Sequence, residues 1–226
     1  MTRIKICGFT NIRPALTAAR AGAEFIGLVF APSRRQIGKE EALQIAEAVH
    51  GSGSDTEVVG VFVNEELEVV NQLVEYCRLD RVQLSGDESW EYCGQVEKPV
   101  IKAIHIPVAE AARIALTEDI LNKIDQGHEL MQNKQVLFLL DSKVRNLYGG
   151  TGEIFNWQLV KEVAAKFPVL IAGGLTPENA GDVIRETHPW GVDVSTGVET
   201  GNEKDEARII SFIRTVREAD KDTESF

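Results

Sequence analysis

Two side chains that can exchange protons stand at the ends of apolar, strand-like runs. Cys7 closes a run at residues 4–7, and Asp141 closes a run at residues 136–141. An ordinary thiol has a pKa of ~8.5, so only about 3% is thiolate at pH 7, and a nearby cation raises that fraction. A carboxyl in an apolar setting keeps its proton more strongly. The pair therefore suits one general base and one general acid. The alternative interpretations are that Cys7 is simply a buried core residue and that Asp141 caps a loop, as cysteines and aspartates often do.

Two glycine-bearing turns follow apolar runs late in the chain. They contain Gly173 and Gly174, and then Ser195, Thr196 and Gly197. Backbone N–H groups without a neighbouring Cβ can approach phosphate oxygens closely. Paired glycines also turn a chain without binding anything, but the two segments together predict a site for a phosphorylated ligand.

Eight short apolar runs with strand propensity must position these residues. They lie at residues 4–7, 25–30, 58–63, 81–84, 100–104, 136–141, 169–172 and 192–195. Segments with helical spacing separate them, and 226 residues shared by eight units leave about 28 residues each. The pattern predicts a single-domain (β/α)8 TIM barrel over residues 1–226, with a frayed polar tail at 220–226. An open doubly wound sheet is the alternative.

In such a barrel, active sites lie at the C-terminal ends of the strands. Strand alternation directs Arg3, Lys5 and Cys7 into the barrel and aligns Asp141 with the inward face of its own strand. Barrel closure makes the eighth and first strands neighbours. We therefore expect Asp193 to compensate Lys5 or Arg3, because a buried unpaired cation is costly. The same cation predicts positive potential beside Cys7, which favours the thiolate.

The composition and charge of the chain argue against several classes of partner. The chain has 24 Lys plus Arg against 35 Asp plus Glu, a net charge of −11, and a pI of about 4.9. Without a basic run, nucleic acid is not an expected partner. The lack of an apolar stretch near ~18 residues and of a signal-like N-terminus predicts a cytoplasmic protein without a membrane partner. Three cysteines without paired spacing argue against a disulfide framework and a structural metal site. A monomer and a homodimer both remain open.

Seven segments, taken in order, form a more specific pattern. They are KICGFT (5–10), GVFVN (60–64), VQLSGDE (82–88), LD (140–141), GGTG (149–152), AGGLTPEN (172–179) and GVDVSTGVE (191–199). This set resembles the phosphoribosylanthranilate isomerases of tryptophan biosynthesis, and the likeness runs from Lys5 to about Phe212. The resemblance implies a barrel that converts N-(5-phosphoribosyl)anthranilate into 1-(2-carboxyphenylamino)-1-deoxy-D-ribulose 5-phosphate. That reaction is an Amadori rearrangement, and the resemblance implies no metal or organic cofactor.

The resemblance also implies roles for single residues. Asp141 matches the general acid that protonates the furanose ring oxygen, and Cys7 matches the general base that removes the C2′ proton. We expect leucines at 137, 139 and 140 to keep Asp141 protonated. Arg35 matches an arginine that contacts the anthranilate carboxylate, and Asp193 matches a carboxylate near the catalytic centre. The two glycine-bearing turns match the segments that hold the 5′-phosphate.

Three features depart from the family pattern. Ser85 stands where the pattern usually has His, Asn156 stands where it usually has Asp, and the connection at residues 107–135 is longer. A histidine-pathway aminoaldose isomerase is a second hypothesis, but it expects a carboxylate at position 7 and half-barrel symmetry, and the sequence has neither. A non-catalytic phosphosugar-binding or anthranilate-binding regulator is a third, favoured only by Ser85 and Asn156.

Overall fold

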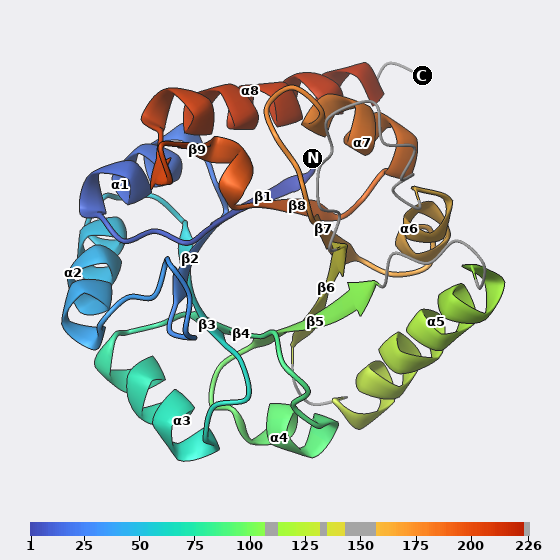
Figure 1. Cartoon of the computed structure of the whole chain (residues 1–226), viewed down its shortest axis with the longest axis horizontal. Coiled ribbons are helices and arrows are strands. Elements are labelled where there is room, and N and C mark those ends of the chain that lie inside the picture. Colours follow the sequence, from blue (N-terminus) through green and yellow to red (C-terminus); the bar gives the residue numbers. More distant parts are fainter. Residues whose placement is uncertain (107–112, 132–134, 143–156, 224–226) are drawn as a thin grey trace.

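The chain folds into a closed barrel of eight parallel strands (Figure 1). The computed structural model describes residues 1–106, 113–131, 135–142 and 157–223. The strands follow one another around the barrel in chain order, and β8 pairs with β1 to close it. They are β1 (Arg3–Cys7), β2 (Phe25–Val29), β3 (Glu57–Phe62), β4 (Arg81–Leu84), β5 (Val100–Ile106), β6 (Val136–Ser142), β7 (Val169–Ala172) and β8 (Gly191–Val194). The predicted (β/α)8 barrel is confirmed, and the open doubly wound sheet is wrong.

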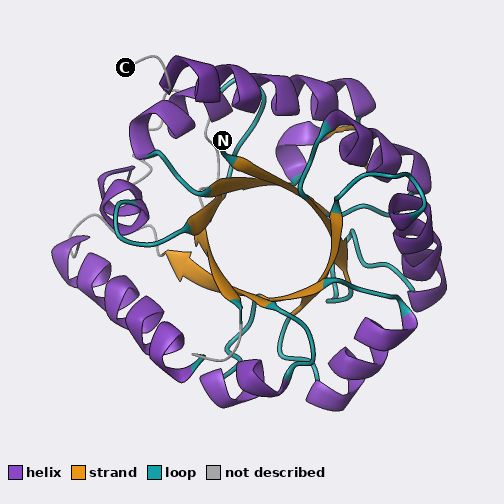
Figure 2. Cartoon of the chain, turned by 180° about the vertical axis from the view of Figure 1, so that it is seen from behind, coloured by secondary structure: helices purple, strands orange, loops and turns teal. Residues whose placement is uncertain are grey.

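Helices surround the barrel as an outer ring (Figure 2). They are α1 (Ile12–Ala21), α2 (Lys39–His50), α3 (Leu67–Tyr76), α4 (Trp90–Gln95), α5 (Arg113–Leu130), α6 (Trp157–Ala164), α7 (Ala180–Thr187) and α8 (Glu206–Thr223). A short 3-10 helix η2 (Thr196–Val198) and a small hairpin of β9 (Glu199–Thr200) and β10 (Glu203–Lys204) follow β8. None of the helices in the described ranges is long and apolar enough to cross a membrane.

The observed elements agree with the local sequence signals. All eight predicted runs are strands, and β5 continues two residues beyond the predicted end, to Ile106. Gly22 ends α1 in the left-handed conformation with φ 96°, a backbone that glycine adopts without strain. The Ser89 side chain caps α4 by accepting a hydrogen bond from Tyr92 N at 3.2 Å. In the long connection at 107–135, α5 occupies Arg113–Leu130, and the stretches on either side lie outside the described residues.

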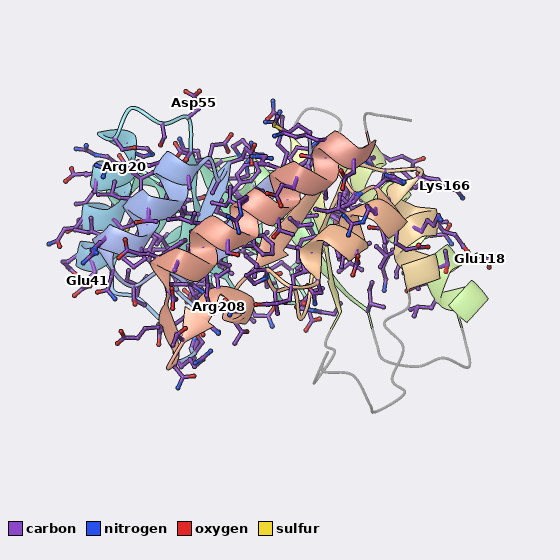
Figure 3. The ribbon with its side chains drawn as sticks, turned by 90° about the horizontal axis from the view of Figure 1, so that it is seen from above. Arg20, Glu41, Asp55, Glu118, Lys166 and Arg208 are labelled. Carbon is purple, nitrogen blue, oxygen red and sulfur yellow. The ribbon has the colours of Figure 1, made fainter. Side chains whose placement is uncertain are left out.

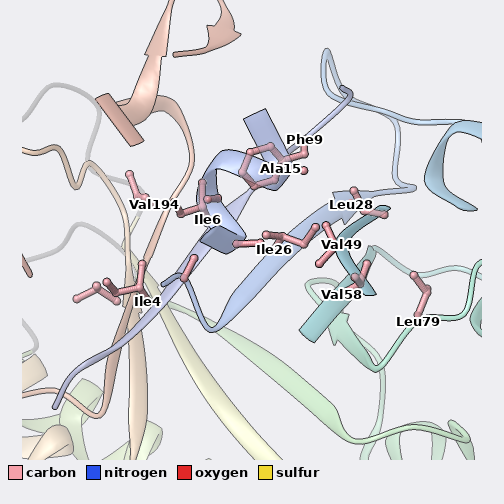
Figure 4. Close-up of a cluster of buried hydrophobic side chains, with 14 of the residues drawn as sticks. Ile4, Ile6, Phe9, Ala15, Ile26, Leu28, Val49, Val58, Leu79 and Val194 are labelled. Carbon is pink, nitrogen blue, oxygen red and sulfur yellow. The ribbon is translucent and has the colours of Figure 1, made fainter. Parts of the chain in front are cut away.

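The outer hydrophobic layer lies between the strands and the helices (Figure 4). Ile4 and Ile6 of β1 and Ile26 of β2 are fully buried there, in one cluster with Ala15 of α1 and Val49 of α2. Burial of this layer is the main term that stabilises a barrel of this size. Ile4 and Ile6 face outward, as alternation with the predicted inward positions of β1 requires.

The inner layer fills the barrel itself. Phe25, Val59, Ile101, Leu139 and Leu170 come from five different strands and form one buried cluster. Alternation along each strand separates these side chains from the outer layer, as the pleat requires. The barrel interior is therefore packed, and chemistry is left to the residues at its ends.

The C-terminal helix is longer than the sequence suggested. We expected a frayed tail from Asp220, but α8 continues through Thr223 and Asp220 is buried. Its carboxylate accepts hydrogen bonds from Thr2 N at 2.9 Å and from Thr2 Oγ1 at 2.6 Å. The structure differs from the tail prediction at residues 220–223, because this contact with Thr2, the residue before β1, holds the last turns of α8. Residues 224–226 lie outside the described chain.

The two rims of the barrel differ in character, and Asp55 and Arg208 mark them in a side view (Figure 3). At the N-terminal rim, a cavity of about 420 Å³ has Arg81 and Glu57 among its lining residues. These two pair with each other at 2.7 Å, and none of the predicted site residues lines the cavity. The predicted site residues lie at the opposite, C-terminal rim.

Candidate active site

A buried ion pair lies beneath the candidate base. Lys5 Nζ of β1 lies 3.1 Å from Asp193 Oδ1 of β8, and their side chains are 0% and 9% exposed. Burial alone would lower the pKa of Lys5, but interactions with Asp193 and Cys7 together outweigh burial and raise it. Burial raises the pKa of Asp193, with Lys5 acting against that rise. The predicted compensation of Lys5 by Asp193 is confirmed, whereas Arg3 approaches Glu24 at 3.8 Å near the other rim.

Cys7 ends β1 immediately above this pair. Burial raises the pKa of its thiol, and the cations of Lys5 and Lys204 oppose that rise without overcoming it. Lys5 favours the thiolate as expected from the sequence, but burial, which the sequence pattern does not show, outweighs it and leaves the pKa of Cys7 raised. A Cβ at Gly27 would lie 2.8 Å from the Cys7 sulfur, so the neighbouring strand closes around the thiol. The raised pKa favours the thiol form of Cys7, and a further positive charge beside the sulfur would act against that preference.

Asp141 ends β6, and its surroundings differ from those we expected. The side chain is 34% exposed, and its Oδ2 lies 3.5 Å from Nδ1 of His105 at the end of β5. Leu139 belongs to the barrel interior and Leu140 to the outer layer, because alternate residues face opposite sides of the strand. The predicted apolar setting for Asp141 is wrong, since an imidazole borders the carboxyl.

Asp193 links the two candidate groups. In the strand register, Asp141 lies opposite Ala172, Ala172 opposite Asp193, and Asp193 opposite Lys5. The Asp193 carboxylate contributes to the raised pKa of Cys7, and Asp141 contributes to the raised pKa of Asp193. The structure therefore brings the thiol and the carboxyl together at the C-terminal rim, within electrostatic reach of one buried aspartate.

The two glycine-bearing turns lie side by side. Gly173 and Gly174 have φ angles of 108° and 63°, which only glycine adopts without strain. A Cβ at Gly197 would lie 1.8 Å from the carbonyl oxygen of Leu175, so the second turn packs directly on the first. The Ser195 hydroxyl donates to the carbonyl oxygen of Cys7 at 2.9 Å, which ties this region to the candidate base.

Arg35 forms part of a charge cluster centred on Glu199. Its Nε and Nη2 donate to the two carboxylate oxygens of Glu199 at 2.6 and 3.1 Å. Arg34 and Lys204 also contact Glu199, at 2.5 and 2.8 Å. Burial favours the neutral acid, but hydrogen bonds from Arg35 and Lys204 outweigh burial and lower the pKa of Glu199. Arg35 is thus a held guanidinium and not the free loop charge that its sequence neighbourhood suggests.

Sequence reasoning missed two residues of the rim. His105 continues the inward positions of β5, so extending the alternation by one step would have found it. Lys204 Nζ donates to the carbonyl oxygen of Ser195 at 2.8 Å, but it lies in a two-residue strand without a periodic signal. Ser85 accepts a hydrogen bond from Gln83 Nε2 at 2.9 Å. Asn156 and the segment at 149–152 lie outside the described residues.

The barrel and its rim define a class of protein, a (β/α)8-barrel enzyme with proton-exchanging groups beside glycine-lined turns. The family described as N-(5'phosphoribosyl)anthranilate (PRA) isomerase matches residues 4–215, and the chain belongs to this family. No group of three His, Cys, Asp or Glu side chains that could hold a metal ion is found among the described residues.

Individual relatives agree with this assignment. The chain is 49% identical over 220 residues to N-(5'-phosphoribosyl)anthranilate isomerase of Dehalococcoides mccartyi, which covers 97% of this chain and 98% of the relative. It is 43% identical to the isomerase of Roseiflexus castenholzii, covering 96% and 98%. The crystal structure of phosphoribosyl anthranilate isomerase from Thermotoga maritima matches with a TM-score of 0.79 at 35% identity, covering 96% and 100%. A complex of this kind of isomerase with reduced 1-(o-carboxyphenylamino)-1-deoxyribulose 5-phosphate matches with a TM-score of 0.79 at 33% identity, covering 96% and 100%.

Proposed function

We propose that this chain isomerises N-(5'-phosphoribosyl)anthranilate in tryptophan biosynthesis, with Asp141 as the general acid and Cys7 as the general base. The observation that carries the role assignment is their placement at one rim on either side of Asp193. Acid and base roles in one site require groups in different environments. Cys7 is buried and Asp141 is one-third exposed beside an imidazole, which supports different tasks for them.

The proposed reaction begins with proton transfer from Asp141 to the furanose ring oxygen. The C1′–O bond breaks with its electrons going to oxygen, and the nitrogen lone pair forms an iminium. The Cys7 thiol loses its proton to solvent beside the new positive charge, and the resulting thiolate takes the C2′ proton. The C–H electron pair forms an enolamine that neutralises the iminium. The enol tautomerises to the ketone product. Every proton is exchanged with the two side chains or with solvent, so the steps balance without an oxidant or reductant.

The raised pKa of Cys7 fits this order of steps. Burial keeps the sulfur as a thiol before ring opening, while Lys5 and Lys204 already act in favour of the thiolate. An iminium formed beside the sulfur adds another positive charge, and opposite charges favour the ionised form. The thiol is therefore expected to ionise when its base form is needed.

Substrate binding is proposed at the charge cluster and the glycine-bearing turns. Glu199 engages Nε and Nη2 of Arg35, which leaves Nη1 to meet the anthranilate carboxylate. Held in this way, the guanidinium loses less conformational freedom when the substrate arrives. The proposed phosphate ligands are the backbone groups and hydroxyls of Gly173, Gly174, Ser195, Thr196 and Gly197. Asp193 is proposed to act indirectly. It lies beneath the site, pairs with Lys5 and contributes to the pKa of Cys7.

The test is turnover of the authentic substrate by the purified chain with EDTA present, followed as the loss of anthranilate-type fluorescence. Cys7→Ser and Asp141→Asn are each expected to lower kcat by about a hundredfold or more while the fold persists. Cys93→Ser and Asp119→Asn are matched controls away from the rim, and both should keep wild-type turnover. Near wild-type turnover in Cys7→Ser or Asp141→Asn would refute that residue's role. Calorimetric binding of a reduced product analogue without any turnover would support the non-catalytic regulator instead.

A further inference from the structure

His105 reaches the candidate active site from β5 and contacts two other elements with its two ring nitrogens. Nε2 lies 2.9 Å from the backbone carbonyl oxygen of Ser85, after β4. Nδ1 lies 3.5 Å from Oδ2 of Asp141 on β6, directly opposite in the strand register. The imidazole therefore bridges the end of β4 to the proposed acid, and the mechanism above does not use it.

The carbonyl contact decides which nitrogen carries a proton. A carbonyl oxygen can only accept, so Nε2 must be the N–H that donates to Ser85. In a neutral ring, Nδ1 is then an acceptor, and it faces a carboxylate oxygen of Asp141, which is also an acceptor when ionised. The contact is favourable only with one proton between them, either on Asp141 with a neutral ring or on His105 with a carboxylate. The 3.5 Å separation is about 0.5 Å longer than a hydrogen bond, and such bonds often tighten when substrate binds.

The Ser85 carbonyl is held by a buried ion pair on the outer face of the barrel. Lys102 Nζ donates to the carbonyl oxygen of Gly86 at 2.7 Å and to Glu88 Oε2 at 2.6 Å. Glu88 in turn accepts from Gly86 N at 3.0 Å, so both the N–H and the carbonyl oxygen of Gly86 are held. The N–H of Gly86 belongs to the same planar peptide unit as the carbonyl of Ser85, which is therefore held as well. A partner anchored in this way can orient the imidazole without moving itself.

We propose that His105 is a positioning residue that holds Asp141 and shares one proton with it. While the pair holds one proton, the fraction of molecules with that proton on Asp141 does not depend on pH, because both one-proton forms contain the same number of protons. A carboxyl without such a partner has no second site for the shared proton, so its protonated fraction changes with pH. The proposal rests on the proposed acid role of Asp141.

Other charged groups act on the same pair. Asp193 on β8 is coupled to Asp141, and Lys5 on β1 is the ion-pair partner of Asp193. Both remain in place when only His105 is changed, so their influence cancels in a comparison of variants. The His105 side chain is 39% exposed, which lets water return the proton after each turnover.

The test uses variants of His105 in the full-length chain. H105Q places an amide N–H near the Nε2 position, so the bond to Ser85 can persist, but it cannot titrate. H105N places an amide near the Nδ1 position and loses the Ser85 contact. The matched control is H50Q, because His50 Nε2 forms an equivalent pair with Asp80 at 2.8 Å, remote from the candidate active site. Single-turnover rates are compared with wild type from pH 5 to pH 8, so that product release does not contribute.

The H105Q-to-wild-type rate ratio is expected to fall as the pH rises from 5 to 8, because the carboxyl of the variant has no neighbouring group with which to share its proton. H105N should show the same slope at a lower overall rate, and H50Q should give a ratio near one throughout. A structural role for His105 predicts a ratio that does not change with pH, and that result would overturn the proposal.

If D141N loses turnover while H105Q matches H50Q, only this inference fails. If D141N keeps turnover, the proposed acid role fails. In the D141N background, H105Q should cause no further loss.

Discussion

The buried Lys5–Asp193 pair makes a quantitative prediction about stability. Replacing Lys5 with Met keeps the length of the side chain and removes the charge. At an effective dielectric constant of ~20, two unit charges 3.1 Å apart attract by about 5 kcal/mol. That attraction is offset by desolvation, but losing one partner leaves a buried charge without compensation. We expect K5M to lower the free energy of unfolding by about 3–5 kcal/mol at pH 7.

The pH dependence of the stability lost in K5M shows whether the uncompensated charge of Asp193 causes the loss. Burial already raises the pKa of Asp193 above its usual value of 3.8, and without Lys5 the main interaction that opposes the rise is lost. A group whose pKa is higher in the folded state stabilises the protein most at low pH and loses that contribution as pH rises. The difference between wild type and K5M should therefore shrink as pH falls from 8 to 5, because Asp193 then escapes its unpaired charge by taking a proton.

Urea denaturation measures both effects, provided that fluorescence and far-UV circular dichroism give coincident transitions. K123M is the matched control, because Lys123 pairs with Asp119 on the surface with side chains 55% and 53% exposed. That pair should contribute no more than about 1 kcal/mol. The double variant K5M/D193N removes both charges and should recover a large part of the loss. A K5M loss no greater than that of K123M, or one that does not change between pH 5 and 8, would refute the reasoning.

Three further predictions follow from single contacts. G197A should lower the free energy of unfolding by about 1–3 kcal/mol and raise KM in steady-state assays, because its Cβ would meet a carbonyl oxygen in the adjoining turn. Burial raises the pKa of Cys77 to about 11, so its protonated form adds stability below pH 9.0 that is lost as pH rises towards 11. Denaturation curves should show wild type losing about 1.4 kcal/mol per pH unit more than C77A in that window. D220A should cost about 1–3 kcal/mol by thermal or urea denaturation, because the N–H and hydroxyl of Thr2 lose their buried acceptor.

Two of these predictions have a control on a comparable residue, and the third is checked by the comparison with wild type. G94A adds a methyl group where no heavy atom lies within 4 Å, so an equal loss there would contradict the argument from Gly197. Equal alkaline slopes for C77A and wild type would show that the Cys77 thiol does not titrate as described. D222A changes an exposed residue two positions along α8, and it should be nearly neutral.

Much of the fold and part of the site could be predicted from the sequence. The eight strands were predicted because apolar runs, β propensity and intervening helical periods are local properties of the chain. Alternation along β1 and β8 then predicted that Asp193 compensates Lys5 or Arg3, since closure of a barrel makes those strands neighbours, and the structure shows Lys5 as the partner. The end of β5 was predicted two residues early, and His105 was missed for that reason alone.

The character of the site depended on residues far apart in the sequence. A local pattern says that Cys7 has a cation nearby, but burial raises its pKa, and burial is the sum of side chains from several strands. Likewise, only the folded chain shows that Glu199 holds Arg35 and that Asp220 secures the last turns of α8. Sequence by itself determined the order of the strands and which side chains point inward, because both follow from short-range geometry. Tertiary structure decided the protonation preferences and partners of those side chains, because solvation and charge interactions act through space and not along the chain.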